Sequence, residues 1–134
     1  MFEHVWAEEP LSFIIAPNGN IPSPDALQNA ELYFGWGYLM NPRIIEKILG
    51  HTLPFAPAVI RGYRREAFLN DGKRDFRLVP SEKDVVMGVV LISPNKEDIA
   101  RLDAFEQVPR VMVKQKIEVM VGDMKREANI YMMV

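Results

Sequence analysis

Glu106 is the residue whose position in the chain most clearly predicts chemistry. Ile99, Leu102 and Glu106 are spaced i, i+3 and i+7, so a helix that continues to position 106 places the carboxylate on its apolar face. Burial disfavours the charged form and raises the pKa of a glutamate from its usual value of about 4.3. A glutamate whose pKa lies near neutral is a good general base. A helix that ends at Phe105 instead leaves Glu106 in solvent, and the spacing alone does not choose between the two.

A pair of glycines forms the second feature that can take part in chemistry. An aromatic run ending at Phe34 predicts a strand, and Gly35 and Gly37 on either side of Trp36 predict a sharp turn after it. Backbone N–H groups at such a turn can point at the oxygen of a ligand. The simpler interpretation is a tight turn that only packs.

Helix signals follow this turn directly. Asn41 is a good N-cap and Pro42 a favourable first helical residue, so the sequence predicts a helix over residues 43–49. Gly50 suits the position just after the last turn of this helix. The turn is therefore expected to join a strand to a helix.

The remaining elements alternate between strands and one more helix. Gly88, inside a β-branched apolar run, marks a bulge or a close approach of two backbones. The combination predicts an α+β fold with a small mixed, mainly antiparallel β-barrel flanked by short helices. The predicted elements are strands over residues 58–63, 85–92 (fully buried), 111–121 (half-buried) and 127–133, a turn at 70–73, and a helix from residue 94 to about 105. Whether the strand at 58–63 extends over residues 64–68 is left open by the pattern.

The first thirty residues differ from the rest because prolines interrupt them four times. They predict an extended arm over residues 1–30, with a short strand near residues 11–15, attached to a domain over residues 31–134. The apolar stretch Leu-Ser-Phe-Ile-Ile in the arm is expected to pack on the domain or on a second subunit, which makes a homodimer plausible.

Composition excludes several classes of function. The 134 residues predict one domain besides the arm, and a net charge of −2 disfavours nucleic acid as a partner. No apolar run approaches the ~18–20 residues that span a bilayer, and a secretion signal is not recognisable. The absence of cysteine removes thiolate chemistry and fits a cytoplasmic protein. Only two histidines are present, which excludes a histidine-rich metal site, and His51 is expected in a solvated connection after the first helix.

Five short motifs follow one another along the chain. They are Phe34-Gly35-Trp36-Gly37-Tyr38-Leu39-Met40-Asn41-Pro42, Arg61-Gly62-Tyr63-Arg64, Gly88-Val89, Ala100-Arg101-Leu102-Asp103-Ala104-Phe105-Glu106 and Ala128-Asn129-Ile130-Tyr131. In their order and spacing, these motifs resemble the gamma-glutamylcyclotransferase-like family, also called avirulence-induced-gene-like. The likeness covers about residues 31–134.

The resemblance implies a fold and an activity. Family members have a small β-barrel flanked by helices and convert a gamma-glutamyl amide or peptide to 5-oxoproline, releasing the amine in a cyclising acyl transfer of transferase or lyase type. The family's catalytic glutamate closes the Leu-Asp-x-Phe-Glu motif, which places the general acid/base at Glu106. The reaction needs neither a metal nor a cofactor, and its partner is a small gamma-glutamyl molecule. The substrate-binding residues implied are Gly35, Trp36, Gly37, Tyr38, Leu39 and Tyr131.

Two departures from the family pattern keep a second hypothesis open. Trp36 stands where the family has tyrosine, and Tyr38 brings a large ring where the family has serine. The chain is therefore either an active cyclotransferase or a non-catalytic relative that binds a small ligand or a protein partner. An open cavity in front of Glu106, beside the backbone amides of the turn, favours the enzyme, and a Tyr38 ring filling that cavity favours the binding protein. The sequence does not identify the gamma-glutamyl substrate.

Overall fold

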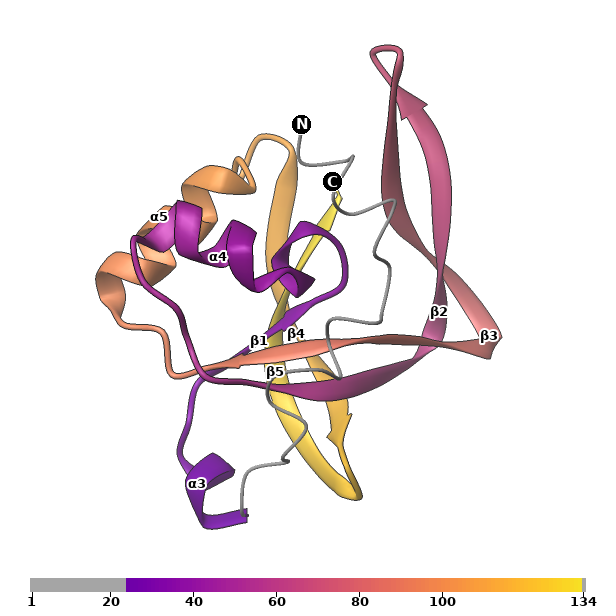
Figure 1. The fold of residues 1–134 in the computed structure, drawn as a ribbon. Helices are drawn as coiled ribbons and strands as arrows, with labels where there is room; N and C mark the ends of the chain where they lie inside the picture. The colour runs from indigo at the N-terminus through magenta and orange to yellow at the C-terminus, as the bar shows by residue number, and fades with distance from the viewer. Residues whose placement is uncertain (1–23, 134) are drawn as a thin grey trace.

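Five strands of this chain close into one barrel in the computed structural model, which describes residues 24–133. Their order around the barrel is β1-β3-β2-β4-β5 (Figure 1). The strands are β1 Leu32–Gly35, β2 Phe55–Asn70, β3 Lys73–Ile92, β4 Met112–Val121 and β5 Met124–Met133. This arrangement confirms the predicted α+β fold with a small barrel.

The sheet is mixed because β1 pairs differently with its two neighbours. It runs antiparallel to β3 and parallel to β5, where Phe34 lies opposite Ile130, while the other pairs are antiparallel. The short parallel pair closes the barrel and brings the chain that follows Phe34 next to Tyr131. The glycine turn therefore emerges beside the C-terminal strand.

Two helices cover one side of the barrel (Figure 1). Helix α4, Pro42–Leu49, has the predicted caps: the Asn41 side chain accepts a hydrogen bond from Arg43 N at 2.9 Å, and Gly50 ends the helix with φ of 83°. Helix α5, Lys96–Phe105, begins later than the predicted residue 94.

The late start of α5 has a local cause. Asn95 Oδ1 accepts a hydrogen bond from Asp98 N at 2.8 Å, and Asp98 Oδ2 accepts one from Asn95 N at 3.0 Å. This reciprocal capping box satisfies two backbone donors at once, so Asn95 rather than Ser93 is the cap. A further short helix, α3 Pro24–Gln28, lies in the segment that was expected to be extended. Residues 1–23 of the arm, which include the strand predicted near residues 11–15, lie outside the described residues.

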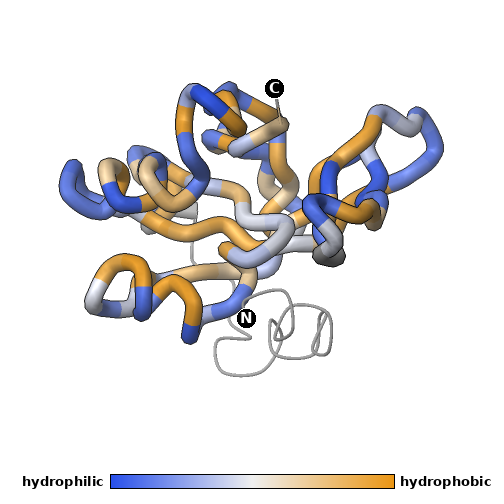
Figure 2. Tube along the Cα trace, turned by 90° about the horizontal axis from the view of Figure 1, so that it is seen from above, coloured by the Kyte–Doolittle hydropathy of each residue, from blue (hydrophilic) through white to orange (hydrophobic). Residues whose placement is uncertain are grey.

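Apolar side chains from every strand fill the barrel. One buried residue from each strand illustrates this core: Phe34, Ile60, Val90, Val119 and Ile130. A second cluster, which includes Leu39, Ile45 and Leu102, is buried among the helices and the strands that they cover. Hydrophobic residues concentrate along the barrel strands and the helices, and the tip of the β2–β3 hairpin is mostly hydrophilic (Figure 2).

Strands β2 and β3 extend well past the barrel as a two-stranded ribbon, which we define as residues 63–80. The sequence predicted strands at 58–63 and 85–92, with an extension of the first over residues 64–68 left open, and it did not predict the first part of β3. The register shifts between Arg61 and Tyr63, where Gly62 has φ of 89°, and the ribbon bends there. Its tip is the turn predicted at residues 70–73. The bend directs the ribbon up along one end of the barrel (Figure 1).

The part of β3 in the barrel is less buried than predicted. Val85 is 51% exposed and Met87 is 50% exposed, whereas Val86 and residues 88–91 are buried. The first residues of this run therefore alternate between exposed and buried side chains, because only one face of the strand meets the core there. The prediction of a fully buried strand was wrong for these two side chains.

Gly88 marks a close approach of two backbones, one of the two predicted alternatives. A Cβ atom there would overlap the carbonyl oxygen of Gly35 and lie 2.8 Å from the Phe34 ring. A Cβ on Gly35 would in turn lie 2.8 Å from the carbonyl oxygen of Leu39. The two glycines thus let β1, β3 and the following turn pack directly on one another. Among residues 24–133, no helix has the length and apolar character needed to cross a membrane.

Candidate active site

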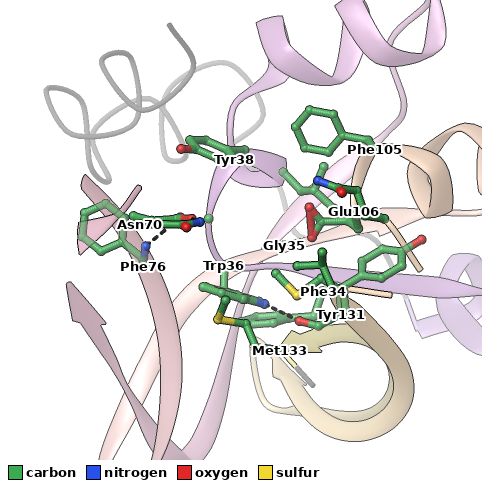
Figure 3. A pocket seen from close by; sticks show the side chains of 16 residues that line it. Phe34, Gly35, Trp36, Tyr38, Asn70, Phe76, Phe105, Glu106, Tyr131 and Met133 are labelled. Carbon is green, nitrogen blue, oxygen red and sulfur yellow. Dashed lines mark hydrogen bonds between the residues drawn. The ribbon is translucent and has the colours of Figure 1, made fainter. Parts of the chain in front are cut away.

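A cavity of about 160 Å³ opens between the glycine turn, the end of α5, β5 and the β2–β3 ribbon (Figure 3). Its volume is far larger than the ~10–15 Å³ that one water needs on the same kind of measure. The structure brings together in its lining all the site residues predicted from the sequence, namely Gly35, Trp36, Gly37, Tyr38, Leu39, Glu106 and Tyr131.

Glu106 is the C-cap of α5. The helix ends at Phe105, yet Glu106 keeps helical dihedrals (φ −82°, ψ −1°) and its N–H bonds to Leu102 O at 3.0 Å. The side chain therefore continues the helical course and is directed at the cavity rather than at bulk solvent (Figure 3). The alternative of a helix that ends at Phe105 was right about the helix end. The alternative that keeps Glu106 out of solvent was right about where the carboxylate lies.

The carboxyl group of Glu106 is strongly perturbed. Burial, and to a lesser extent the negative charge of Asp75, raise its pKa from the ordinary value to about 7. A carboxyl group with this pKa is partly ionised at neutral pH, so it can both accept and return a proton.

The glycine turn continues into η1, a short 3-10 helix over Tyr38–Met40, closed by hydrogen bonds from Met40 N to Gly37 O and from Asn41 N to Tyr38 O. Trp36 is only 6% exposed, and its indole N–H donates to Tyr131 O at 2.9 Å. The indole therefore anchors the turn to β5, and its N–H is not offered to the cavity.

The Tyr38 ring does not fill the cavity. It packs edge-on against Phe105, with ring centroids 6.3 Å apart and planes at 81° (Figure 3). Tyr38 is half-buried, and the cavity stays open beside it. The large ring found in place of serine thus lies against the end of α5.

A polar network around its hydroxyl group holds Tyr131 in place. Its hydroxyl donates to Asp103 Oδ1 at 2.5 Å, and Lys114 Nζ lies 3.2 Å from both oxygens of the same carboxylate. Lys114 Nζ also donates to Tyr33 Oη at 3.0 Å. Burial and the neighbouring Asp103 charge raise the pKa of Tyr131 above its ordinary value, so the phenol stays protonated.

The sequence reasoning missed the roles of Asp103, Lys114 and Tyr33 in this network. Asp103 stands three residues before Glu106 in the Leu-Asp-x-Phe-Glu motif, and that spacing was the available signal. The position of Lys114 opposite Tyr131 depends on the β4–β5 register, which the sequence does not reveal.

Ribbon residues form the wall of the cavity opposite α5, and no pattern in the sequence pointed to them. Asn70, Asp75 and Phe76 line it, and Asn70 Nδ2 donates to Asp75 Oδ2 at 3.2 Å. Of the described residues that line the cavity, none is lysine, arginine or histidine. Its charged side chains are therefore the carboxylates of Glu106 and Asp75.

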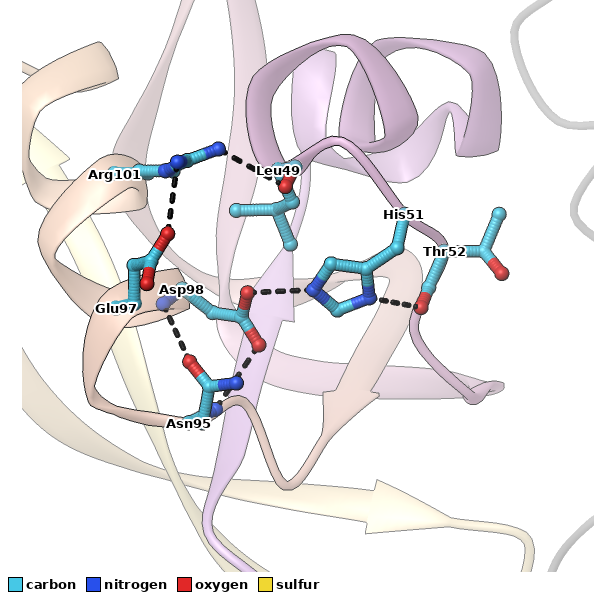
Figure 4. A network of polar contacts seen from close by, with 7 residues as sticks. All are labelled: Leu49, His51, Thr52, Asn95, Glu97, Asp98 and Arg101. Carbon is cyan, nitrogen blue, oxygen red and sulfur yellow. Dashed lines mark hydrogen bonds and ion pairs between the residues drawn. The ribbon is translucent and has the colours of Figure 1, made fainter.

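A separate polar cluster joins the end of α4 to the start of α5 (Figure 4). His51 Nε2 lies 2.7 Å from Asp98 Oδ1, and Nδ1 lies 2.8 Å from Thr52 O. Both partners are acceptors, so the ring satisfies them together only as the imidazolium, and these bonds raise the pKa of His51 above 6.5. The side chain is 50% exposed, as expected for a solvated connection, but it also forms an ion pair. In the described part of the chain, no group of three or more histidine or acidic residues is placed to hold a metal ion.

A match to a protein-family model identifies the domain that carries the cavity. The model for gamma-glutamyl cyclotransferase, AIG2-like proteins matches residues 33–134. The chain belongs to this family. The match spans the barrel, the glycine turn and Glu106 of this AIG2-like chain, and no curated protein matches it in sequence.

Solved structures support the same assignment for the fold of this AIG2-like chain. A solution structure from Arabidopsis thaliana is 28% identical with a TM-score of 0.68, over 84% of this chain and 74% of that one. A second from Arabidopsis thaliana is 24% identical with a TM-score of 0.65, over 79% of this chain but only 63% of the relative's length. A structure named gamma-glutamyl cyclotransferase is 21% identical with a TM-score of 0.68, over 79% and 68% of the two chains.

Proposed function

We propose that this chain is an enzyme that converts a gamma-glutamyl compound to 5-oxoproline and a free amine or amino acid. The observation that carries the proposal is the partly buried carboxyl group of Glu106, with a pKa of about 7, facing a cavity that the glycine turn also lines. A perturbed titratable group in a cavity is a good candidate for acid–base chemistry.

In the proposed reaction, the substrate's α-amino nitrogen attacks its own γ-carbonyl carbon. Glu106 accepts the proton that this nitrogen loses as the new C–N bond forms. The tetrahedral intermediate then collapses, the bond to the leaving nitrogen breaks, and Glu106 returns the proton to that nitrogen. Atoms and charges balance within the substrate and one carboxyl group, so the reaction requires neither a metal nor a cofactor.

Two further effects would lower the barrier. The backbone of the Gly35–Leu39 turn supplies N–H donors to the oxyanion as it develops, and donors that are already in place need no rearrangement during the reaction. The attack is intramolecular, so a cavity that folds the substrate into the reactive shape supplies part of the rate enhancement. Tyr131, held by Asp103, forms part of the surface against which the substrate folds.

The alternative function is that of a non-catalytic relative that binds a small ligand or a protein partner. The substitutions at Trp36 and Tyr38 favour it, because the indole N–H is already bonded to Tyr131 O and Tyr38 brings a large ring where the family has a small residue. The open cavity beside Tyr38 favours the enzyme. A cytoplasmic location, a homodimer and the absence of nucleic-acid or membrane partners remain predictions from the sequence.

The test is release of 5-oxoproline from a panel of gamma-glutamyl dipeptides and gamma-glutamyl amines by the wild type and Glu106→Gln. We expect turnover by the wild type and a loss of about 10²–10⁴-fold in kcat for the variant, the range typical of general acid–base groups. Glu97→Gln is the matched control, since Glu97 lies on the same helix but pairs with Arg101 on the surface.

Two outcomes would contradict the proposal in different ways. Silence of the wild type across the panel, in a protein that is folded by circular dichroism, supports the binding protein. Turnover that persists in Glu106→Gln keeps the enzyme but removes Glu106 from its chemistry.

A further inference from the structure

Arg65 lies behind the glycine turn and binds its backbone. Its Nε donates to Trp36 O at 3.0 Å, and its Nη2 donates to Met87 O at 3.0 Å. The same Nη2 lies 3.6 Å from Met40 Sδ. A single guanidinium thus ties the turn to β3, and a fork of donors in a fixed plane is suited to holding two carbonyl groups at once.

The orientation of one peptide unit follows from this contact. The Trp36–Gly37 peptide is trans, and in a trans peptide the C=O and the N–H point in opposite directions. The carbonyl points at Arg65, which is not among the cavity residues, whereas Trp36 and Gly37 both line the cavity. The N–H of Gly37 is therefore directed to the cavity side of the turn.

The N–H of Gly37 has no acceptor among residues 24–133. The hydrogen bonds that close η1 begin with Met40 N, which bonds to Gly37 O. Buried or partly buried backbone N–H groups in proteins are nearly always paired, so a donor left open at a cavity is suited to a ligand oxygen.

We propose that Arg65 is a positioning residue of the cyclisation. It holds the Trp36–Gly37 peptide so that the N–H of Gly37 donates to the substrate's γ-carbonyl oxygen as that oxygen becomes an oxyanion. This inference rests on the proposed function, because it assigns one donor of that reaction. Arg65 itself does not touch the substrate.

The position of Arg65 in the fold gives it a second consequence. It lies on the ribbon, just beyond the bulge at Gly62, and the same ribbon carries Asp75 and Phe76 to the cavity. The guanidinium therefore links the turn that presents the donor to the ribbon that forms the opposite wall. A shift of the ribbon would rotate the Trp36–Gly37 peptide and change the shape of the cavity at the same time.

The test compares Arg65→Lys and Arg65→Met with Arg64→Met. Arg64 is the preceding residue on the same strand, but its side chain is exposed and pairs with Glu66 on the surface. For a gamma-glutamyl substrate turned over by the wild type, we expect kcat to fall about 10–100-fold in Arg65→Lys and further in Arg65→Met, while KM changes less than about two-fold. Loss of one oxyanion donor costs about 10²–10³-fold in kcat, and a misaligned donor costs part of that.

A purely structural role predicts different results. It predicts a lower melting temperature with unchanged kcat per folded molecule, or a rise in KM with unchanged kcat, and either result overturns the proposal. The pH at which kcat/KM rises reports Glu106 and is expected to stay the same in Arg65→Lys. A shift of that pH would show that Arg65 acts through the base instead, which also overturns the proposal.

A spectroscopic readout separates this proposal from the proposed function. In nuclear magnetic resonance spectra of the protein without ligand, Arg65→Lys should move the Trp36 carbonyl-carbon and Gly37 amide resonances well beyond the changes in Arg64→Met. Equal, small changes in both variants overturn the role of Arg65 whether or not any substrate is turned over. A moved Gly37 resonance in a protein with no cyclotransferase activity keeps Arg65 as the residue that orients the peptide and rejects the reaction.

Discussion

Glu106 and Asp75 are two carboxyl groups that face one cavity from different elements. Glu106 ends α5, and Asp75 comes from the ribbon. Burial is the larger cause of the raised pKa of Glu106, and the charge of Asp75 adds to it. A second negative charge beside a base makes its ionisation less favourable, which tunes the base upward.

Asp75→Asn is therefore expected to lower the pKa of Glu106. The wild-type rate kcat/KM should rise with pH through about 7, where Glu106 loses its proton. Without the charge at position 75 the same rise should occur at lower pH, with the plateau little changed. The measurement is the pH profile of kcat/KM for both proteins. A profile that keeps its midpoint would mean that burial alone sets the pKa.

At the scale of elements, the closest contact is between β1 and β3. Gly88 and Gly35 meet backbone to backbone, and the space for a Cβ on Gly88 is already taken by Gly35 O and the Phe34 ring. These atoms belong to the barrel and cannot move aside as a flexible side chain can.

Gly88→Ala is expected to destabilise the fold by about 1–3 kcal/mol or more, the usual range for overpacking a well-packed core. The measurement is the free energy of unfolding in urea. Met87→Ala is the control, since Met87 is 50% exposed next to it and should cost well under about 1 kcal/mol. Equal stability of Gly88→Ala and the wild type would show that β1 can move away from β3.

The connection that follows α4 is tied to the first turn of α5 by the ion pair of His51 with Asp98. Its pKa is raised by Asp98 and by Thr52 O, so the folded state binds the proton more tightly than the unfolded state does. The resulting stabilisation is complete below the unfolded-state pKa of about 6.5 and disappears as the pH rises through the raised folded-state pKa.

His51→Gln is therefore expected to lower the melting temperature at pH 6 and to leave it nearly unchanged at pH 9. Melting curves of the wild type and the variant across this range provide the measurement. The variant Asp98→Asn should remove the same pH-dependent difference, although it also weakens the capping box of α5. A difference between the wild type and His51→Gln that is constant with pH would argue against the ion pair.

At the scale of the whole molecule, the barrel and the ribbon have separable tasks. The barrel strands bury the core, whereas the ribbon contributes the cavity wall through Asn70, Asp75 and Phe76. Glu66 and Arg77 lie opposite each other on the two strands of the ribbon, between this wall and the barrel. Arg77 Nη2 lies 2.7 Å from Glu66 Oε1.

Replacing residues 67–76 by an Asn-Gly turn, which joins Glu66 to Arg77, should leave the barrel folded. Arg65 is kept, but the wall of the cavity is lost, so kcat/KM should fall roughly ten-fold or more, equivalent to about 1.4 kcal/mol of lost contacts. Circular dichroism and steady-state kinetics check the two halves of this expectation. Full activity in the shortened protein would show that the ribbon does not contact the substrate.

Local structure could be predicted from the sequence where a few neighbouring residues determine it. The caps of α4 at Asn41 and Gly50 were predicted because each makes its contact within four residues along the chain. The close approach at Gly88 was one of two alternatives that a glycine inside an apolar strand suggests. The start of α5 was misplaced because Ser93-Pro94 and Asn95 are both good helix openings, and only the bond to Asp98 distinguishes them.

By itself, the sequence determined the class of fold, the glycine turn between a strand and a helix, and Glu106 as the candidate base. These features depend on spacing and on short-range hydrogen bonds. Only the tertiary structure decided that the Trp36 indole bonds to Tyr131 O, that Arg65 bonds to Trp36 O and that Asp75 lies on the same cavity as Glu106. Such contacts join residues far apart in the chain, and they depend on strand register and on the bend of the ribbon at Gly62, which no short stretch of sequence specifies.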